Sequence, residues 1–177
     1  MHPLKKFKYC PVCGEHFKEN SWKSKKCNNC NFEYFMNPSA ANVAFILNDR
    51  GELLVTRRKN NPAQGTFDLP GGFTDMGETA EESVIREVKE ETGLTVTHTR
   101  YLFSLPNTYC YSNINIPTLD MFFACEVKST SDLHAADDAA ECLWIKPENI
   151  NPSLFGLDSI RKGVKIFITN ITETNKK

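Results

Sequence analysis

Short apolar runs separated by turn residues dominate the sequence from residue 41 onward. Residues 41–47 are apolar apart from Asn42, a turn cluster follows at residues 48–51, and residues 52–57 form a second run, so we predict a β-hairpin. Four further stretches indicate strands: residues 66–69, 96–105, 118–127 and 143–145. Two stretches indicate helices: residues 79–92, followed by Gly93, and residues 157–167. This mixture predicts an α+β sandwich.

A different pattern occupies residues 1–36, where aliphatic side chains are sparse and cysteines recur at short spacing. Cys10 and Cys13 form one CxxC pair, and Cys27 and Cys30 form a second pair. Each CxxC turn delivers two thiolates, and tetrahedral zinc takes four such ligands. The pattern resembles a zinc ribbon. Because cysteine fills all four positions, no coordination position is left for water, and we expect the Zn²⁺ to be structural.

Two other interpretations of the cysteine pairs stay open. They could form a redox site, although a redox CxxC normally lies at a strand–helix junction of a larger domain. They could also be two unrelated pairs. The other three cysteines, Cys110, Cys125 and Cys142, lack neighbours at metal-ligand spacing and are expected to be buried small hydrophobic side chains.

The charge distribution changes near the same boundary. Residues 1–36 carry seven lysines and three acids, whereas the remaining chain carries more acids than bases. Asn37 precedes Pro38, and a residue before proline is disfavoured in the helical region, so this dipeptide is a natural hinge. We therefore predict a zinc ribbon over residues 1–36 and a second domain over residues 37–177.

Overall composition argues against a membrane or nucleic-acid protein. The net charge is −1, so no global field attracts nucleic acid or lipid, and no apolar run approaches the ~20 residues of a spanning helix. The N-terminus lacks a signal-peptide pattern, and CxxC pairs suit a reducing compartment, so we expect a cytoplasmic protein. Zinc ribbons also occur in nucleic-acid-binding proteins, and the lysines at positions 23, 25 and 26 keep that alternative open.

The helix predicted over residues 79–92 carries clustered carboxylates. Glu87, Glu90 and Glu91 are spaced i, i+3 and i+4, which places them on one helical face. Clustered oxygen ligands suit Mg²⁺ or Mn²⁺, and the glycines at positions 71 and 72 allow a close approach of backbone to phosphate. The alternative is a solvated acidic face. Val84, Ile85 and Val88 are expected to face the core.

The stretch from Gly72 to Leu94 matches a family pattern at every fixed position. It resembles the Nudix box, G-x5-E-x7-R-E-U-x-E-E-x-G-U, in which U is aliphatic; Glu78 and residues 86–94 fill its fixed positions. The similarity extends to segments on both sides of the box and covers most of residues 40–168. These segments are residues 53–57, 65–72 and 138–145.

The resemblance implies an α/β/α sandwich and a divalent-metal site. By position, Glu87, Glu90 and Glu91 would bind Mg²⁺ or Mn²⁺, and the Gly72 carbonyl would add a further oxygen. Arg86 would orient a glutamate through charge-assisted hydrogen bonds.

The resemblance leaves the general base open, because the base varies among family members. A glutamate of the box, Asp138 or Glu141 could take this role, and we rank Glu141 first. Glu78 would support the start of the helix or the residues that surround the metal ligands.

Substrate contacts are predicted from residues near the strands. Arg57 or its neighbour Arg58 is placed to bind phosphate, although both could be exposed strand-end cations. Tyr109 could stack on a base or ribose, although aromatic residues near strands more often pack.

The implied activity is hydrolysis of the diphosphate linkage in a nucleoside-diphosphate-linked metabolite, so the expected partner is a small nucleotide. A zinc ribbon ahead of such a domain resembles the NADH pyrophosphatase branch, but residues 104–112 depart from its SQPWPFPxS signature. ADP-ribose, NAD(H) and dinucleoside polyphosphates therefore all remain open. Family members are often dimers, which leaves a homodimer open. The competing hypothesis is a nucleotide-sensing regulator whose ribbon contacts nucleic acid.

Overall fold

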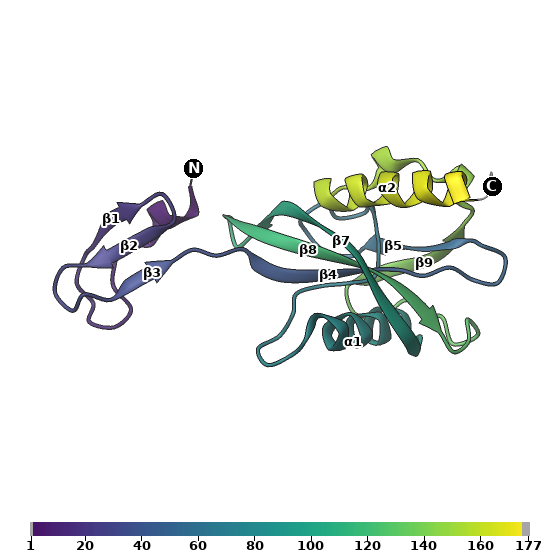
Figure 1. The fold of residues 1–177 in the computed structure, drawn as a ribbon, viewed down its shortest axis with the longest axis horizontal. Helices are drawn as coiled ribbons and strands as arrows, with labels where there is room; N and C mark the ends of the chain where they lie inside the picture. Colours follow the sequence, from purple (N-terminus) through teal and green to yellow (C-terminus); the bar gives the residue numbers. More distant parts are fainter. Residues whose placement is uncertain (1, 175–177) are drawn as a thin grey trace. The chain divides into compact units, whose positions relative to one another are not determined.

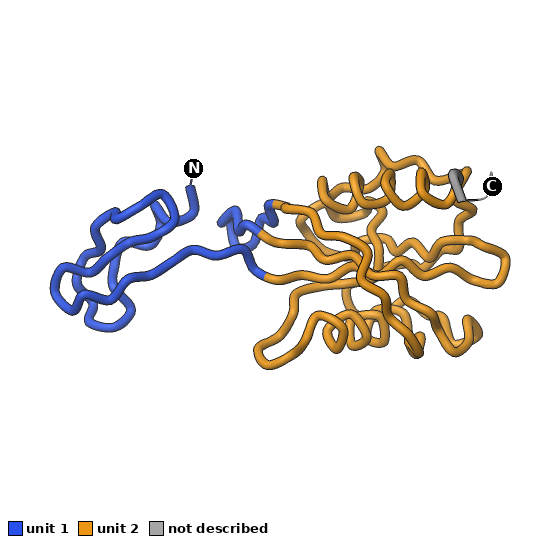
Figure 2. The backbone as a smooth tube through the Cα atoms, viewed as in Figure 1, with its two compact units in different colours: residues 1–39, 108–117 blue, residues 40–107, 118–177 orange. Residues whose placement is uncertain are grey.

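A computed structural model describes residues 2–174. The chain forms two compact units, one of residues 1–39 with 108–117 and one of residues 40–107 with 118–177 (Figure 2). The first division lies close to the predicted boundary after residue 36, and the segment 108–117 groups with the N-terminal residues. The domain limits 1–36 and 37–177 stay a prediction.

The N-terminal module is a small antiparallel sheet with almost no apolar core. It begins with the 3-10 turn η1 (Pro3–Lys6), and its strands β1 (Phe17–Ser21), β2 (Ser24–Cys27) and β3 (Glu33–Phe35) lie in the order β1-β2-β3. Among the described residues up to position 36, the buried hydrophobic side chains are Leu4, Cys10 and Cys27. A module with so few buried apolar groups needs another source of stability.

The larger unit contains most of two three-stranded sheets and two long helices (Figure 1). The strands of one sheet lie in the order β4-β8-β7, and those of the other in the order β6-β5-β9. The strand bounds are β4 (Ser39–Phe45), β5 (Leu53–Arg58), β6 (Phe67–Asp68), β7 (Val96–Tyr111), β8 (Ile114–Val127) and β9 (Ala139–Ile145). The helices are α1 (Ala80–Thr92), the 3-10 turns η2 (Pro147–Asn149) and η3 (Pro152–Leu154), and α2 (Asp158–Thr174). None of the helices within residues 2–174 has the length and apolarity needed to cross a bilayer.

The helices cover opposite faces of the strands, which makes the body an α/β/α sandwich and confirms the predicted fold class (Figure 1). Successive residues of a strand point to opposite faces, so each buried strand feeds two cores. Val43 and Phe45 of β4 pack with the α2 side chain Val164, whereas Ala44 packs with Val84 of α1. This double burial explains why β4 has a continuous apolar run rather than an alternating one.

The predicted hairpin of residues 41–47 and 52–57 is wrong beyond its turn. Leu47 pairs with Leu53, and the Leu54 N–H donates to the Ile46 carbonyl, so the turn forms as expected. Past this point β4 joins β8 and β5 joins β6 and β9, in separate sheets. The main pairing partner of each strand lies far along the chain, so the local pattern of apolar residues does not predict it.

Helix α1 has well-formed ends. Thr79 accepts from the Glu82 N–H while the Glu82 carboxylate accepts from the Thr79 N–H, which completes a capping box. Gly93 ends the helix in the left-handed region at φ 71°, as predicted. Val84 and Val88 are fully buried, but Ile85 is 40% exposed, so its predicted place in the core is wrong.

Candidate active site and metal centres

Two glycines bring the chain before α1 against the helix. Gly71 has φ +152°, and its position leaves no room for a side chain beside the backbone of Asn42 and Val43. A Cβ on Gly72 would lie 2.5 Å from Oε1 of Glu87. Only glycine therefore allows the backbone at position 72 to approach the Glu87 carboxylate this closely.

Arg86 links the acidic side chains into one cluster. Its Nε donates to Glu78 Oε1 at 2.7 Å, and its Nη1 donates to Glu87 Oε1 at 2.9 Å and to Glu90 Oε2 at 3.0 Å. Its Nη2 donates to the Phe73 carbonyl at 3.1 Å. Arg86 hydrogen bonds lower the pKa of Glu78 to about 2. The guanidinium thus fixes three carboxylates and the loop that precedes the helix.

Glu91 lies deeper than the other two predicted ligands. It is 8% exposed, and one of its oxygens accepts from the Gly71 N–H at 3.1 Å. Burial raises the pKa of the Glu91 carboxyl well above its usual range, and the negative charges of Asp68 and Glu87 add to this effect. An ionised Glu91 therefore gains from a nearby cation, which suits the proposed metal site.

The oxygen atoms in the cluster have the chemistry of a Mg²⁺ or Mn²⁺ site. Glu87 and Glu90 converge on the same Arg86 nitrogen, so their oxygens already lie close together. The Gly72 carbonyl accepts from the Asn42 N–H at 2.8 Å, and a carbonyl has a second lone pair available for a cation. The residues present therefore fit such an ion by their chemistry, and its binding by all three glutamates stays a prediction.

Arg57 and Glu141 lie on the other side of the sheet. They are paired across β5 and β9, with Arg57 Nε 2.9 Å from Glu141 Oε2. Arg57 shares a strand face with Val55, which belongs to the core under α2, and its guanidinium lies 4.7 Å from the Phe67 ring centroid. This face is opposite α1, so the fold does not bring Glu141 to the three box glutamates. Its role as general base stays a prediction.

Asp138, the other acid considered as a base, belongs to the α1 side. Its charge adds to the raised pKa of Glu91, which places it within electrostatic reach of that carboxyl. Asn60 Nδ2 donates to Asp138 Oδ1 at 2.8 Å, and the Lys59 N–H donates to the Asp138 carbonyl at 2.9 Å. These contacts fix the segment that leads into β9.

Two interactions near the cluster were not predicted. Arg58 forms an ion pair with the buried Asp68, on the strand face that points to α1. Asn42 is buried and donates to Ser83 Oγ at 2.6 Å, and Ser83 lies 3.4 Å from an Arg86 nitrogen. The alternation of residues 53–58 could have assigned Arg57 and Arg58 to opposite faces. The Asn42–Ser83 contact spans 41 positions, and no local signal reports it.

Tyr109 lies in β7, within the segment 108–117 that groups with the N-terminal unit. Its side chain is half-buried. Its assignment to substrate binding stays a prediction.

The four cysteines of the ribbon meet as the spacing predicts. Their sulfur atoms all lie within 4.8 Å of one another, with Cys10 Sγ 3.6 Å from Cys30 Sγ and Cys13 Sγ 3.5 Å from Cys27 Sγ. Tetrahedral Zn–S bonds of about 2.3 Å require sulfur separations of about 3.8 Å. A hydrogen bond with the Glu15 backbone helps to lower the pKa of Cys13 to about 7. The cluster thus fits a zinc ion with small adjustments.

Replacement of Gly72 by alanine is expected to lower activity without unfolding the protein. The new Cβ would push the Glu87 carboxylate away from its position beside Arg86, and a displacement of about 1 Å in a catalytic group can cost about 10²-fold in rate. Steady-state kcat and a thermal melt of the same sample measure both effects. A variant with the wild-type kcat would contradict the proposed arrangement of the backbone and Glu87.

Comparison with known proteins agrees with this geometry. The sequence model of the NUDIX domain matches residues 36–164. The ADP-ribose pyrophosphatase of Methanocaldococcus jannaschii is 35% identical over 133 residues, which cover 74% of this chain and 75% of that protein. The NAD-capped RNA hydrolase NudC of Vibrio vulnificus is 28% identical over 153 residues, which cover 85% of this chain and 55% of that protein.

Among solved structures, a NUDIX hydrolase from Nitrosomonas europaea aligns with a TM-score of 0.71 over 92% of this chain and 90% of that chain, at 18% identity. The bifunctional NMN adenylyltransferase/ADP-ribose pyrophosphatase from Francisella tularensis aligns with a TM-score of 0.57 at 24% identity, over 77% of this chain and 42% of that chain. At these identities the likeness concerns the fold.

Proposed function

Since this chain belongs to the Nudix hydrolase family, we propose that it hydrolyses the diphosphate linkage of a nucleoside-diphosphate-linked metabolite with Mg²⁺ or Mn²⁺. The observation that carries the proposal is the arrangement of the α1 carboxylates, with Glu87 and Glu90 held by Arg86, Glu91 held by the Gly71 N–H, and the Gly72 backbone beside Glu87. A protein that only sensed a nucleotide would not need this set of ligands. The competing regulator hypothesis is therefore less well supported.

In this proposal the protein's own groups hold and orient the reacting components. Glu87, Glu90, Glu91 and the Gly72 carbonyl would hold the divalent cation. A bound cation neutralises diphosphate charge and lowers the pKa of water, which makes water an effective nucleophile at neutral pH. Arg86 holds the Glu87 and Glu90 carboxylates in place through its Nη1, so that little reorganisation is needed during the reaction.

The products follow from attack of water on one phosphorus atom of the diphosphate. The P–O bond to the bridging oxygen breaks, and a nucleoside monophosphate separates from a second phosphorylated fragment. The four-cysteine centre contributes no open coordination position, so we assign it a structural Zn²⁺.

We propose ADP-ribose, or a related adenine dinucleotide other than NADH, as the substrate. The 35% identical relative is named an ADP-ribose pyrophosphatase, and residues 104–112 depart from the SQPWPFPxS signature of the NADH pyrophosphatase branch that the chain resembles. Sites built to pair with one polar group reject analogues without it by large factors. Loss of a signature should therefore redirect the choice of substrate while leaving the metal chemistry intact.

The specificity proposal predicts that kcat/KM on ADP-ribose is at least comparable to that on NADH. Both values are to be measured with Mg²⁺ in the same buffer, with AMP release as the common readout. A preference for NADH above about tenfold, which corresponds to about 1.4 kcal/mol in transition-state binding, would overturn the substrate assignment. It would leave the hydrolase assignment standing, because NADH contains the same diphosphate linkage.

A further inference from the structure

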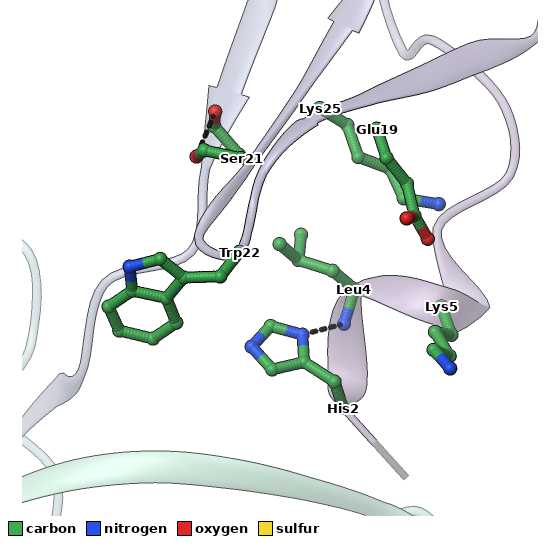
Figure 3. Close-up of a pocket in the computed structure, with 8 residues that line it drawn as sticks. His2, Leu4, Lys5, Glu19, Ser21, Trp22 and Lys25 are labelled. Atoms are coloured by element: carbon green, nitrogen blue, oxygen red, sulfur yellow. Dashed lines mark hydrogen bonds between the residues drawn. The ribbon is translucent and has the colours of Figure 1, made fainter.

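The zinc-ribbon module carries an aromatic side chain in an unusual environment. Trp22 lies in the turn between β1 and β2 and is 79% exposed. Tryptophan is normally among the more buried residues, and an exposed indole ring on a polar module offers a large stacking surface. Trp22 borders a pocket of about 220 Å³ that is formed entirely within this module (Figure 3).

The pocket is preformed by the N-terminal segment. Leu4 is buried at its centre, between Trp22 and Lys25, and the His2 ring lies edge-on to the indole with the centroids 6.2 Å apart (Figure 3). The Leu4 N–H donates to His2 Nδ1 at 3.3 Å. Lys25 is buried, and its ammonium donates to the Phe7 carbonyl at 2.8 Å, which ties this segment to the sheet. Little ordering is therefore needed before a flat ligand binds.

The module around the pocket is strongly basic. Seven lysines and three glutamates occur in residues 1–36, and every one of these lysines except Lys25 is exposed. Lys5 and Lys25 line the pocket together with a single acid, Glu19. Lysines spread over the whole module suit a ligand with several phosphates, because lysine side chains neutralise backbone phosphates and release their counterions.

We propose that the ribbon module binds single-stranded nucleic acid, with an unpaired base stacked on Trp22 and backbone phosphates held by Lys5 and the surrounding lysines. An aromatic platform beside a positively charged surface is the combination that binds single strands without sequence preference. A duplex suits the site less well, because its bases are already stacked on one another. This inference concerns residues 1–36 alone and does not rest on the proposed hydrolase activity.

Fluorescence anisotropy of the full zinc-loaded chain with a labelled oligouridylate of about ten nucleotides tests the proposal. We expect Trp22→Ala to weaken binding by about tenfold or more and Trp22→Phe to retain most of it. We expect the affinity of the wild type to fall steeply between about 50 and 200 mM salt. Lys5→Glu combined with Lys23→Glu should weaken binding and flatten this salt dependence.

Intrinsic fluorescence provides an independent readout. The chain has two tryptophans, so in a Trp144→Phe variant the emission comes from Trp22 alone. Oligouridylate should quench this emission, and uridine monophosphate at the same nucleotide concentration should not, because it lacks the additional phosphates. The same binding by the wild type and Trp22→Ala, or equal quenching by the mononucleotide, would overturn the proposal. So would tighter binding of an RNA duplex of the same length.

The test is separable from the hydrolase assignment. Trp22→Ala should hydrolyse the best dinucleotide substrate at the wild-type rate, since Trp22 lies outside the carboxylate cluster. Loss of oligonucleotide binding with unchanged hydrolysis supports the ribbon site. A wild-type protein that hydrolyses the substrate but does not bind the oligonucleotide contradicts the ribbon site alone.

Discussion

Glu91→Gln is expected to lower kcat by about 10²-fold or more while the fold stays intact. Loss of one anionic ligand removes several kcal/mol of charge stabilisation in a metal site, and each 1.36 kcal/mol changes the rate tenfold. The fold should survive because glutamine keeps an oxygen that can accept from the Gly71 N–H, as Glu91 does at 3.1 Å. Steady-state assays with saturating Mg²⁺ measure the loss.

The thermal stability of the metal-free protein provides a second test of this variant. Burial raises the pKa of Glu91 in the folded state. The protonated carboxyl is therefore compatible with the folded protein at low pH, and stability decreases as the pH rises above the pKa of Glu91 in the unfolded chain. Glutamine carries no charge at any pH. With a chelator present, the Tm of Glu91→Gln near pH 8 should therefore equal or exceed that of the wild type. The difference in Tm should shrink towards pH 4.

Glu81→Gln is the matched control for this variant. Glu81 lies on the same helix, is exposed, and occupies a variable position of the box. It should keep nearly the wild-type kcat, whereas Glu90→Gln should show a large loss like that of Glu91→Gln. Wild-type rates for Glu90→Gln or Glu91→Gln would contradict the assignment of the metal site.

Cys27→Ser is expected to unfold the ribbon module but not the catalytic body. Structural zinc contributes about 10–16 kcal/mol in zinc-finger peptides, and Cys27 is one of three buried hydrophobic side chains described in residues 2–36. Without the ion this module has too small a core to fold. Zinc content should drop from about one equivalent per chain to a small fraction, and hydrolysis of a dinucleotide should continue.

Cys110→Ser serves as the control, because Cys110 lies outside the four-sulfur cluster and is exposed, so its predicted burial is wrong. It should retain the zinc content of the wild type. Elemental analysis that finds less than half an equivalent of zinc in wild-type protein purified without chelators would contradict the zinc site. Full zinc retention by Cys27→Ser would contradict the ligand assignment.

Local spacing along the chain determined much of the candidate chemistry. The i, i+3, i+4 spacing of Glu87, Glu90 and Glu91 fixes their relation on any α-helix, and Thr79 and Gly93 mark where that helix begins and ends. Each CxxC pair likewise brings its own two thiolates together, because one tight turn separates them. Such features depend on neighbours within a few residues and can be predicted from sequence.

Tertiary structure alone decided which face of the sheet Arg57 and Glu141 occupy and how deeply Glu91 is buried. Continuous apolar strands have cores on both sides, so their sequence does not say that Arg57 and Glu141 face away from α1. Glu91 accepts from the distant Gly71 N–H, and the charge of Asp68 adds to the raised pKa of its carboxyl. Strand β4 separates from β5 because β8, far along the chain, pairs with it. The periodicity of hydrophobic residues indicates that a strand or helix is buried. The elements against which it packs are set by long-range contacts.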